Sequence, residues 1–435
     1  MAKKSVLVIG GGIAGIQSAL DLANMGFQVY LVEKTPSIGG RMSQLDKTFP
    51  TNDCSMCILA PKMIEAGRHP NIKLLTYSEV EEVAGDPGKF RVKIRKKARS
   101  VDEEKCTGCG VCMQKCPYKT DSEFQVGLAK RKAAYITFPQ AVPNVATIDP
   151  DICIYIKSEG KKCGACIKFC DAGAIDFSQQ DRIIEVEVGS IILATGFDLY
   201  DPSGLEEYGY GKIKNVITAM QFERMISASG PSGGQLQRPS DGKAPKNLAF
   251  IQCVGSRDTR HKLYCSSVCC MHATKEAILA SEHYPDLKAF IFYTDMRAVG
   301  KRFQEYIARA EQEYKVTYIR SRPSEITENP DNGNPIVWYE ETTARNRTSM
   351  EVDMVVLCQA MVPSGEQKKL SEMLNLKLNA YQFVDIPDRL FHPVDTEIPG
   401  VFACGFCQAP QDIPDSVVQA SAAAARAAEF MSKEK

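Results

Sequence analysis

Cysteine spacing constrains this chain more than any other feature of its sequence. Between Cys106 and Cys170 lie eight cysteines in two runs. The first run has the spacing C-x2-C-x2-C-x3-C followed by Pro117, and the second repeats it with the first gap stretched to nine residues. This spacing wraps three thiolates round one [4Fe–4S] cluster and sends the fourth to a second cluster. A zinc ribbon needs only four ligands from two CxxC pairs, so zinc is the less favoured interpretation, and disulfides less still.

The pairing rule for such runs predicts two clusters in a ferredoxin-like module. One predicted ligand set is Cys106, Cys109, Cys112 and Cys170. The other is Cys116, Cys153, Cys163 and Cys166. The module is therefore expected to carry electrons.

Composition limits the partners and the cellular compartment that can be expected for this module. The chain has 435 residues, with 53 basic and 53 acidic side chains, so its balance favours neither nucleic acid nor an anionic membrane as a partner. Seventeen cysteines in such spacing predict a reducing, cytoplasmic compartment. No apolar run approaches the roughly 20 residues of a membrane span, so we expect membrane contact only through a partner.

The N-terminal segment has the pattern of a dinucleotide-binding turn. A buried strand is predicted over 5–9, then a glycine-rich turn, a helix to about residue 25, and a second strand ending at Glu33. Glycines there let backbone N–H groups approach a pyrophosphate at a helix N-terminus, and the acidic residue accepts from a ribose hydroxyl. The candidate cofactor-binding residues of this segment are Gly10, Gly12, Ile13, Ala14, Gly15, Glu33 and Lys34.

The remaining pattern places the cluster module inside this domain. Residues 73–94 predict two strands with a Gly-Asp-Pro-Gly turn, and the basic stretch 126–134 predicts a helix between the cysteine runs. The expected domains are a nucleotide-binding domain formed by 1–99, 181–200 and 356–435, an inserted two-cluster ferredoxin domain at 100–180, and a second dinucleotide-like domain at 201–355.

The second dinucleotide-like domain lacks the glycine fingerprint. An apolar strand begins at Asn247, but no GxGxxG sequence follows it, and the segment carries cysteines instead. One interpretation is a buried core of thiols. The favoured one is a third [4Fe–4S] cluster, because two adjacent cysteines at a strand-to-helix turn are an odd choice for packing alone. The predicted ligands are Cys253, Cys265, Cys269 and Cys270.

Five further cysteines stay open at this stage. Cys54 and Cys57 could form a redox-active dithiol, ligate a cluster, or be buried inert thiols. Cys404 and Cys407 could join them on a fourth cluster, although lining a cofactor pocket is favoured. Cys358 has no assigned role.

Several stretches together resemble the A subunits of the heterodisulfide reductase family. They are TFPTNDCSMCILAPKM, RPSDGKAPKNLAFIQCVGSRD, the cysteine run ending at Cys270, the inserted ferredoxin, and GVFACGFCQAP with the alanine-rich end. The resemblance implies an α/β fold, a thioredoxin/glutathione-reductase-like flavoprotein with two dinucleotide domains and an inserted 2[4Fe–4S] ferredoxin domain. It implies FAD and at least two clusters, with the second cysteine set supplying a third.

The resemblance also extends the candidate FAD site. It adds Gly40, Arg41, Ala194, Thr195, Gly196 and Gly405. The family signature near the C-terminus has an aspartate after its glycine, where this chain has Phe406. Relative to long members we expect no cluster-bearing domain before Val6 and no second ferredoxin after the final helix.

Three classes of function remain at this stage. The first is a flavin hub, bifurcating or simply distributing electrons from a donor module to B- and C-type subunits, with ferredoxin as a further partner and a homodimeric core. The second is a component of a quinone-linked complex, equivalent to its A-type flavoprotein, that serves a sulfur-metabolising reductase of the adenylylsulfate type. The third, an NAD(P)H-dependent oxidoreductase, is disfavoured by the missing second fingerprint.

Overall fold

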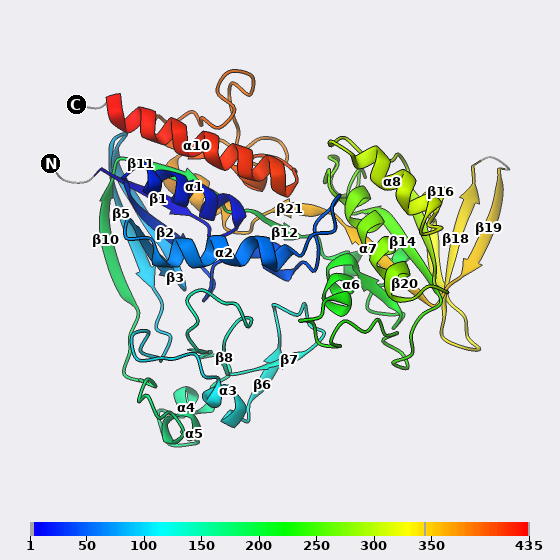
Figure 1. The fold of residues 1–435 in the computed structure, drawn as a ribbon, viewed down its shortest axis with the longest axis horizontal. Helices are drawn as coiled ribbons and strands as arrows, with labels where there is room; N and C mark the ends of the chain where they lie inside the picture. The colour runs from blue at the N-terminus through cyan, green and yellow to red at the C-terminus, as the bar shows by residue number, and fades with distance from the viewer. Residues whose placement is uncertain (1–3, 343–344, 434–435) are drawn as a thin grey trace. The chain divides into compact units, whose positions relative to one another are not determined.

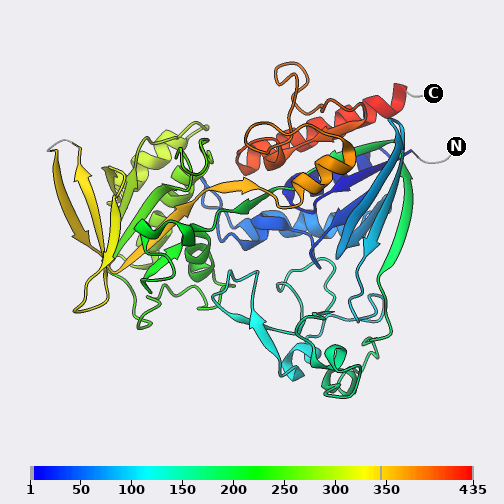
Figure 2. The same ribbon diagram turned by 180° about the vertical axis from the view of Figure 1, so that it is seen from behind.

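The computed structural model describes residues 4–342 and 345–433. The chain forms two compact units (Figures 1 and 2). Unit 1 comprises Met1–Ser43, Cys57–Phe197 and Pro363–Lys435, and unit 2 comprises Gln44–Met56 and Asp198–Val362. The excursion of Gln44–Met56 into unit 2 has no signal in the sequence pattern.

Unit 1 is built on a five-stranded sheet in which every neighbouring pair is parallel. Its order is β22 (Val401–Ala403), β11 (Ser190–Leu193), β1 (Ser5–Ile9), β2 (Gln28–Glu33) and β3 (Ile72–Thr76). Strands of such a sheet are buried on both faces, which explains why SVLVI and SIIL read as continuous apolar runs.

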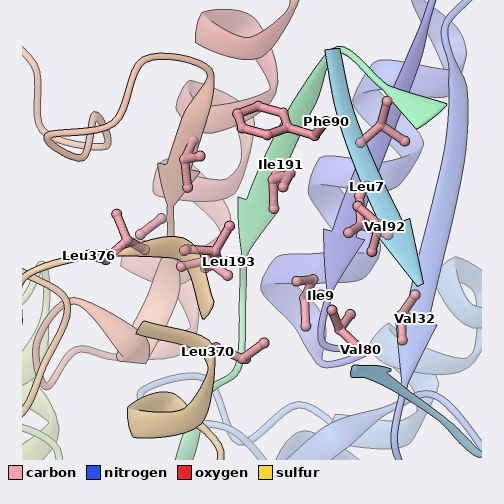
Figure 3. Packing of buried hydrophobic residues seen from close by; sticks show 14 of the residues in the cluster. Leu7, Ile9, Val32, Val80, Phe90, Val92, Ile191, Leu193, Leu370 and Leu376 are labelled. Carbon is pink, nitrogen blue, oxygen red and sulfur yellow. The ribbon is translucent and has the colours of Figure 1, made fainter. Parts of the chain in front are cut away.

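The two faces of this sheet pack against different layers. Leu7 and Ile9 point into a core shared with a three-stranded antiparallel sheet and with Leu370 of α9 (Gln367–Leu374) (Figure 3). The antiparallel sheet is formed by β4 (Ser78–Asp86), β5 (Lys89–Lys96) and β10 (Arg182–Val188). The hairpin predicted over 73–94 is confirmed as β4 and β5, except that its first residues, 73–76, belong to β3 of the parallel sheet. Elsewhere α1 (Ile13–Asn24) packs against α10 (Ile413–Lys433) (Figure 1). The unit also contains most of α2 (Ser55–Arg68).

The helix predicted over 126–134 is wrong. The chain there turns back, and β7 (Lys130–Lys132) pairs with β6 (Lys119–Asp121). Arg131 supplies the physical reason, because its guanidinium binds Glu123 at 2.5 and 2.6 Å and Asp149 at 2.7 Å. These tertiary ion pairs outweigh the weak helical preference of the basic stretch.

The inserted module has short helices and a small core of its own. Its elements are α3 (Val111–Lys115), β8 (Ala134–Tyr135), β9 (Thr147–Ile148), α4 (Ile154–Lys157) and α5 (Ala165–Lys168). Val101, Ile148 and Ala174 pack there among the cysteines. Arg99, which is 2% exposed, joins the module to the parallel sheet by donating to the hydroxyl of Thr147 and the carbonyl of Pro36, each at 2.8 Å.

Unit 2 repeats the architecture of unit 1. Its parallel sheet has the order β13 (Val216–Thr218), β20 (Met354–Gln359), β14 (Asn247–Val254), β15 (Lys288–Tyr293) and β16 (Thr317–Arg320). A three-stranded antiparallel sheet follows, formed by β17 (Glu325–Glu328), β18 (Pro335–Glu341) and β19 (Asn346–Glu351). By position in the sheet, β14 corresponds to β1 and β15 to β2. Short strands β12 (Phe197–Leu199) and β21 (Met361–Pro363) pair with each other.

A buried ion pair holds the helices of unit 2. Lys275 on α7 (Cys269–His283) donates to both carboxylate oxygens of Glu223 on α6 (Ala219–Ile226), at 2.7 and 2.6 Å, and both side chains are essentially inaccessible to solvent. His272 lies 2.9 Å from the same carboxylate. Burial opposes ionisation of Glu223, but Lys275 and His272 hold its pKa well below the ordinary value. The third helix of the unit is α8 (Phe303–Gln312).

None of the helices in the described part of the chain combines the length and apolar character that a membrane span requires.

Removing one partner of this ion pair should strongly destabilise unit 2. We expect Lys275→Met to lower the free energy of unfolding by about 3–5 kcal/mol, because it removes the lysine ammonium that balances the buried Glu223 carboxylate and leaves only His272 and the backbone N–H of Asp46 beside it. Chemical denaturation of the native and variant proteins measures the difference. Lys288→Met, at an exposed site, should cost less than about 0.5 kcal/mol and is the control.

The contribution of Glu223 should also depend on pH. Its folded-state pKa is depressed, so this stability is present above the ordinary carboxyl pKa of 4.5 and is lost as pH falls below that value. A Lys275→Met variant with native stability at pH 7 would contradict this account.

Candidate functional site

The turn between β1 and α1 has the geometry of a phosphate cradle. Gly10 has φ +111°, and a Cβ there would lie 2.3 Å from the carbonyl oxygen of Ala194. Gly12, the residue before α1, has no atom within 4 Å of where its Cβ would be. The first N–H groups of α1 therefore face open space, with the positive end of the helix dipole behind them.

Glu33 lies directly over this turn. Its carboxylate, in an 8% exposed residue, accepts from the backbone N–H of Gly11 at 2.7 Å. It also accepts from the backbone N–H and the hydroxyl of Thr35, each at 2.8 Å. The acid at the end of β2 is thus held at the position from which it can bind a ribose hydroxyl.

The other predicted cofactor-binding residues of unit 1 gather around the same turn. Gly39 donates to the carbonyl of Gly11 at 2.8 Å, which brings Gly40 against Gly12. A Cβ at Gly405 would lie 3.0 Å from that of Ala14. The remaining residues of the set lie as follows: Ile13 and Gly15 in α1, Arg41 in the short helix Gly40–Gln44, Thr195 bonded to Gln367 at 3.4 Å, Gly196 after β11, and Lys34 paired with Glu366 at 3.7 Å.

Phe406 fills the position where the family signature has aspartate. It is 4% exposed and packs against Phe197, with ring centroids 4.5 Å apart, and against Phe383 at 6.0 Å. An aromatic contact therefore replaces a carboxylate here. The side chain of Phe406 itself offers no hydrogen bond to a ribityl chain.

These residues fit FAD. The open cradle at Gly12 accommodates a pyrophosphate, and Glu33 suits a ribose. When bound, FAD supplies one- or two-electron chemistry.

The inserted module brings its eight cysteines together in two groups, each drawn from both runs. Cys112 lies within electrostatic reach of Cys106, Cys109 and Cys170. Cys153 interacts in the same way with Cys116 and Cys163, and Cys166 with Cys153 and Cys163, although Cys166 also interacts with Cys112 of the first group. The grouping matches the two predicted ligand sets, which stay predictions.

Burial and neighbouring thiols make these sites unfavourable for bare thiolates. Burial, together with Cys106, raises the pKa of Cys112 to about 11, and burial with Cys153 raises that of Cys166 to about 12. The backbone N–H of Ala174 already points at the sulfur of Cys170, at 3.3 Å. A cationic iron core compensates the charge that four crowded thiolates would otherwise carry, so this donor set fits a cluster.

The third cysteine set assembles where β14 ends and α7 begins. Cys253 is in β14 with φ +61°, Cys269 and Cys270 open α7, and the sulfur of Cys269 interacts with those of Cys253, Cys265 and Cys270. Burial raises the pKa of Cys269 well above its ordinary value, and raises that of Cys270 to about 11. The N–H of Ser267 points at the sulfur of Cys265, at 3.3 Å. This donor set also fits an iron–sulfur cluster.

Two residues beside this set were missed by sequence reasoning. The guanidinium of Arg257 interacts with the Cys253 sulfur; its Nη2 donates to Asp295 at 2.6 Å, and its Nη1 is buried without a hydrogen-bond partner among the described residues. Cys358 of β20 is 3% exposed and interacts with Cys269. Only tertiary structure brings them here, so spacing gave no signal.

The remaining cysteines fall into two pairs. Cys54 and Cys57 are joined as a disulfide. Cys404 and Cys407 are fully buried in unit 1. Burial raises the pKa of Cys407 to about 12, and its thiol donates to the carbonyls of Leu193 and Cys404 at 3.3 and 3.2 Å. This arrangement is that of inert packed thiols lining the FAD domain.

The cradle can be tested by contrasting two glycines. We expect Gly12→Val to change the stability of the flavin-free protein by no more than about 1 kcal/mol, since its φ of −76° suits any residue. The same change should weaken FAD binding at least tenfold by blocking the pyrophosphate. Gly10→Val should instead lose folding stability, because of its close contact and positive φ. Flavin fluorescence and thermal unfolding separate the two outcomes.

Arg257 should tune whatever redox centre Cys253 ligates. Replacing it by Gln removes a positive charge beside a thiolate, so we expect the midpoint potential of that centre to fall by roughly 50–90 mV, the size of a 1–2 kcal/mol charge interaction. Potentiometric titration followed by electron paramagnetic resonance measures the change. Arg257→Lys, which keeps the charge, should recover part of it. Equal potentials in all three proteins would exclude this role.

Comparison with known proteins agrees with this geometry. A family model described as FAD dependent oxidoreductase matches residues 5–55, and one described as 4Fe-4S binding domain matches residues 99–120. They indicate an oxidoreductase with FAD and an iron–sulfur cluster. Thioredoxin reductases of Lactococcus lactis and T. acidophilum share the fold. Their TM-scores are 0.54 and 0.52 at 15% and 13% identity, covering 99% of this chain and 100% and 98% of theirs. The predicted fold class is confirmed.

Curated relatives are far more similar in sequence. Methanopyrus kandleri has two iron–sulfur A subunits of CoB–CoM heterodisulfide reductase. The second is 55% identical to this chain, over 97% of this chain and 63% of the length of that subunit. The A subunit of the H(2):CoB-CoM heterodisulfide,ferredoxin reductase of Methanothermobacter thermautotrophicus is 52% identical over the same shares. This chain thus spans just under two thirds of their length. Over nearly all of its own length, the chain is a homologue of the heterodisulfide reductase A subunits.

Proposed function

We propose that this chain is the FAD- and [4Fe–4S]-containing electron-transfer subunit of a heterodisulfide reductase-like complex. It passes electrons between a donor module and B- and C-type partner subunits through one flavin and three clusters. The observation that carries the proposal is the contrast between the two units, which have the same sheet but different chemistry where the central strand ends.

In unit 1 the central strand leads directly into a helix. β1 ends at Ile9 and α1 begins at Ile13, so the N-terminus of α1 is open to a pyrophosphate. The glycines of this turn leave room for the cofactor, and Glu33 orients it.

In unit 2 the corresponding place is taken by thiols. β14 ends at Val254, and α7 begins only at Cys269, with Cys270 as its second residue. Thiols at the first turn of α7 leave no glycine cradle for a nicotinamide dinucleotide. The helix N-terminus favours the negative charge of a thiolate-ligated cluster in the same way that α1 favours a phosphate.

This arrangement makes electron entry through clusters more favourable than hydride entry from NAD(P)H. The inserted module adds two further cysteine groups within unit 1 itself. The chain's residues then have three tasks: binding FAD, ligating clusters, and keeping the cluster sulfurs bonded to backbone N–H groups. In this proposal electrons reach or leave the flavin one at a time, and not in pairs as a hydride.

Cofactor content tests the composition part of the proposal. Protein prepared without oxygen should contain one FAD and about twelve irons, four for each cluster. Cys109→Ala and Cys269→Ala should each lose about four irons and retain FAD, because the three ligand sets are separate. Four irons per flavin in the native protein, or stoichiometric zinc, would reject the three-cluster composition.

Electron-donor choice tests the electron-transfer part. In stopped-flow measurements, dithionite or a reduced ferredoxin should bleach the flavin, whereas NADH and NADPH should leave it oxidised. Rapid bleaching by NADH would restore the dehydrogenase alternative.

A further inference from the structure

One exposed loop lies directly against the third cysteine set. It runs from Thr294 to Arg302, between β15 and α8, and we call it the basic loop. The sulfur of Cys270 lies 3.8 Å from the carbonyl oxygen of Asp295, and the backbone N–H of Arg297 is directed at the same sulfur. Cys270 is itself 5% exposed, so the basic loop is what separates this sulfur from solvent on that side.

The basic loop carries three cations and a single acid, Asp295, which interacts electrostatically with Arg297 as well as with Arg257 and Arg320. Arg297, Lys301 and Arg302 are exposed, and within the described residues none of their side chains forms an ion pair or a hydrogen bond. The loop's acid, Asp295, is already bound to Arg257 at 2.6 Å and lies 3.7 Å from Arg320. The N-terminus of the ten-residue α8 adds the positive end of a helix dipole at Arg302, against Glu305 in its first turn.

An apolar residue stands among these cations. Val299 is 90% exposed, more than any other large hydrophobic residue in the described part of the chain. A small apolar centre with a charged rim is the anatomy of a transient interface, in which charge steers the encounter and the contact area stays small. The patch is too short to follow a nucleic-acid backbone, which favours a protein partner.

We propose that the basic loop is the docking surface for an acidic electron-carrier protein, which exchanges single electrons with the centre held by Cys253, Cys265, Cys269 and Cys270. The inference rests on the proposed function and adds the place and chemistry of the encounter. One electron leaves the reduced carrier and enters the oxidised centre, and no bond is made or broken. The cations attract the carrier's acidic face, and the loop backbone brings its redox group close to Cys270.

Charge reversal of the loop gives a sharp test. The holoprotein, prepared without oxygen, is mixed with a reduced, small acidic 2[4Fe–4S] ferredoxin as the probe, and the second-order rate of electron entry is followed at low and high salt. We expect Arg297→Glu/Lys301→Glu/Arg302→Glu to lower this rate at least tenfold at low salt. The native rate should fall as salt rises, and the variant should show little of this dependence.

The sheet itself offers a matched control. Lys214, Lys246 and Lys288 are exposed. Lys214 and Lys246 precede β13 and β14, and Lys288 is the first residue of β15, so all three lie at the amino-terminal edge of the parallel sheet, opposite the loop. Reversing all three changes the net charge by the same amount. This control variant should keep the native rate within about threefold. Both variants should retain native flavin, iron and full reduction by dithionite.

The outcomes separate this inference from the proposed function. If Cys269→Ala keeps all its iron, the third cluster and the proposed function fail. If the cluster is present but both charge variants slow equally, or neither slows, the docking surface is wrong. The basic loop would also be reassigned if its reversal abolished binding to RNA or to anionic lipid vesicles while electron entry stayed native.

Discussion

The positive field at the carboxyl-terminal edge of each parallel sheet, where a strand leads into a helix, is the constraint on which the structure depends. A strand that leads into a helix leaves unpaired backbone N–H groups and the positive end of a dipole at that edge. In unit 1 the open space at Gly12 leaves this field to a phosphate. In unit 2 the same field acts on Cys269 and Cys270, and Arg257 adds a full positive charge beside Cys253. In the proposed function, two copies of one architecture therefore serve two kinds of anion.

Burial of the cysteines in unit 2 favours metal ligation over thiol reactivity. Free thiols there hold their protons, since burial and neighbouring sulfurs raise the pKa of Cys269 and Cys270. The group is therefore a poor nucleophile as it stands and a good ligand set once a cationic metal core replaces the protons. The same reasoning separates Cys407, whose thiol already donates to two backbone carbonyls and faces no opposing cysteine cage among the described residues. Cysteine count alone does not distinguish these environments.

Local patterns allowed much of the fold to be predicted from sequence. The glycine turn, Glu33 and the β4–β5 hairpin depend on short-range spacing, and the structure has each of them in place. The grouping of the ferredoxin cysteines into two ligand sets is also predicted from spacing, and it stays a prediction, because Cys166 interacts with Cys112 as well as with Cys153 and Cys163. The helix expected over 126–134 failed for the opposite reason, since Arg131 is held by acids from elsewhere in the chain. Two further features depend on long-range contacts and so could not be predicted from local patterns. Arg257 is held beside Cys253 by Asp295, which is 38 residues away. The segment Gln44–Met56 belongs to unit 2, where Glu223 accepts a hydrogen bond from the N–H of Asp46.

Net charge says little about how such a protein meets its partners. With 53 basic and 53 acidic side chains, the chain has no net charge. Electrostatic attraction of a partner therefore has to come from an uneven distribution of charge over the surface. Exposed lysines occur at both edges of the unit 2 sheet, and charge alone does not choose between them. What distinguishes the basic loop is that its backbone contacts Cys270, whereas Lys288 is separated from the loop by the length of β15, about 17 Å. Attraction is useful for electron transfer only where it brings a carrier to a redox centre, and in our proposal the basic loop is the place in unit 2 that combines exposed cations with contact to a cluster ligand.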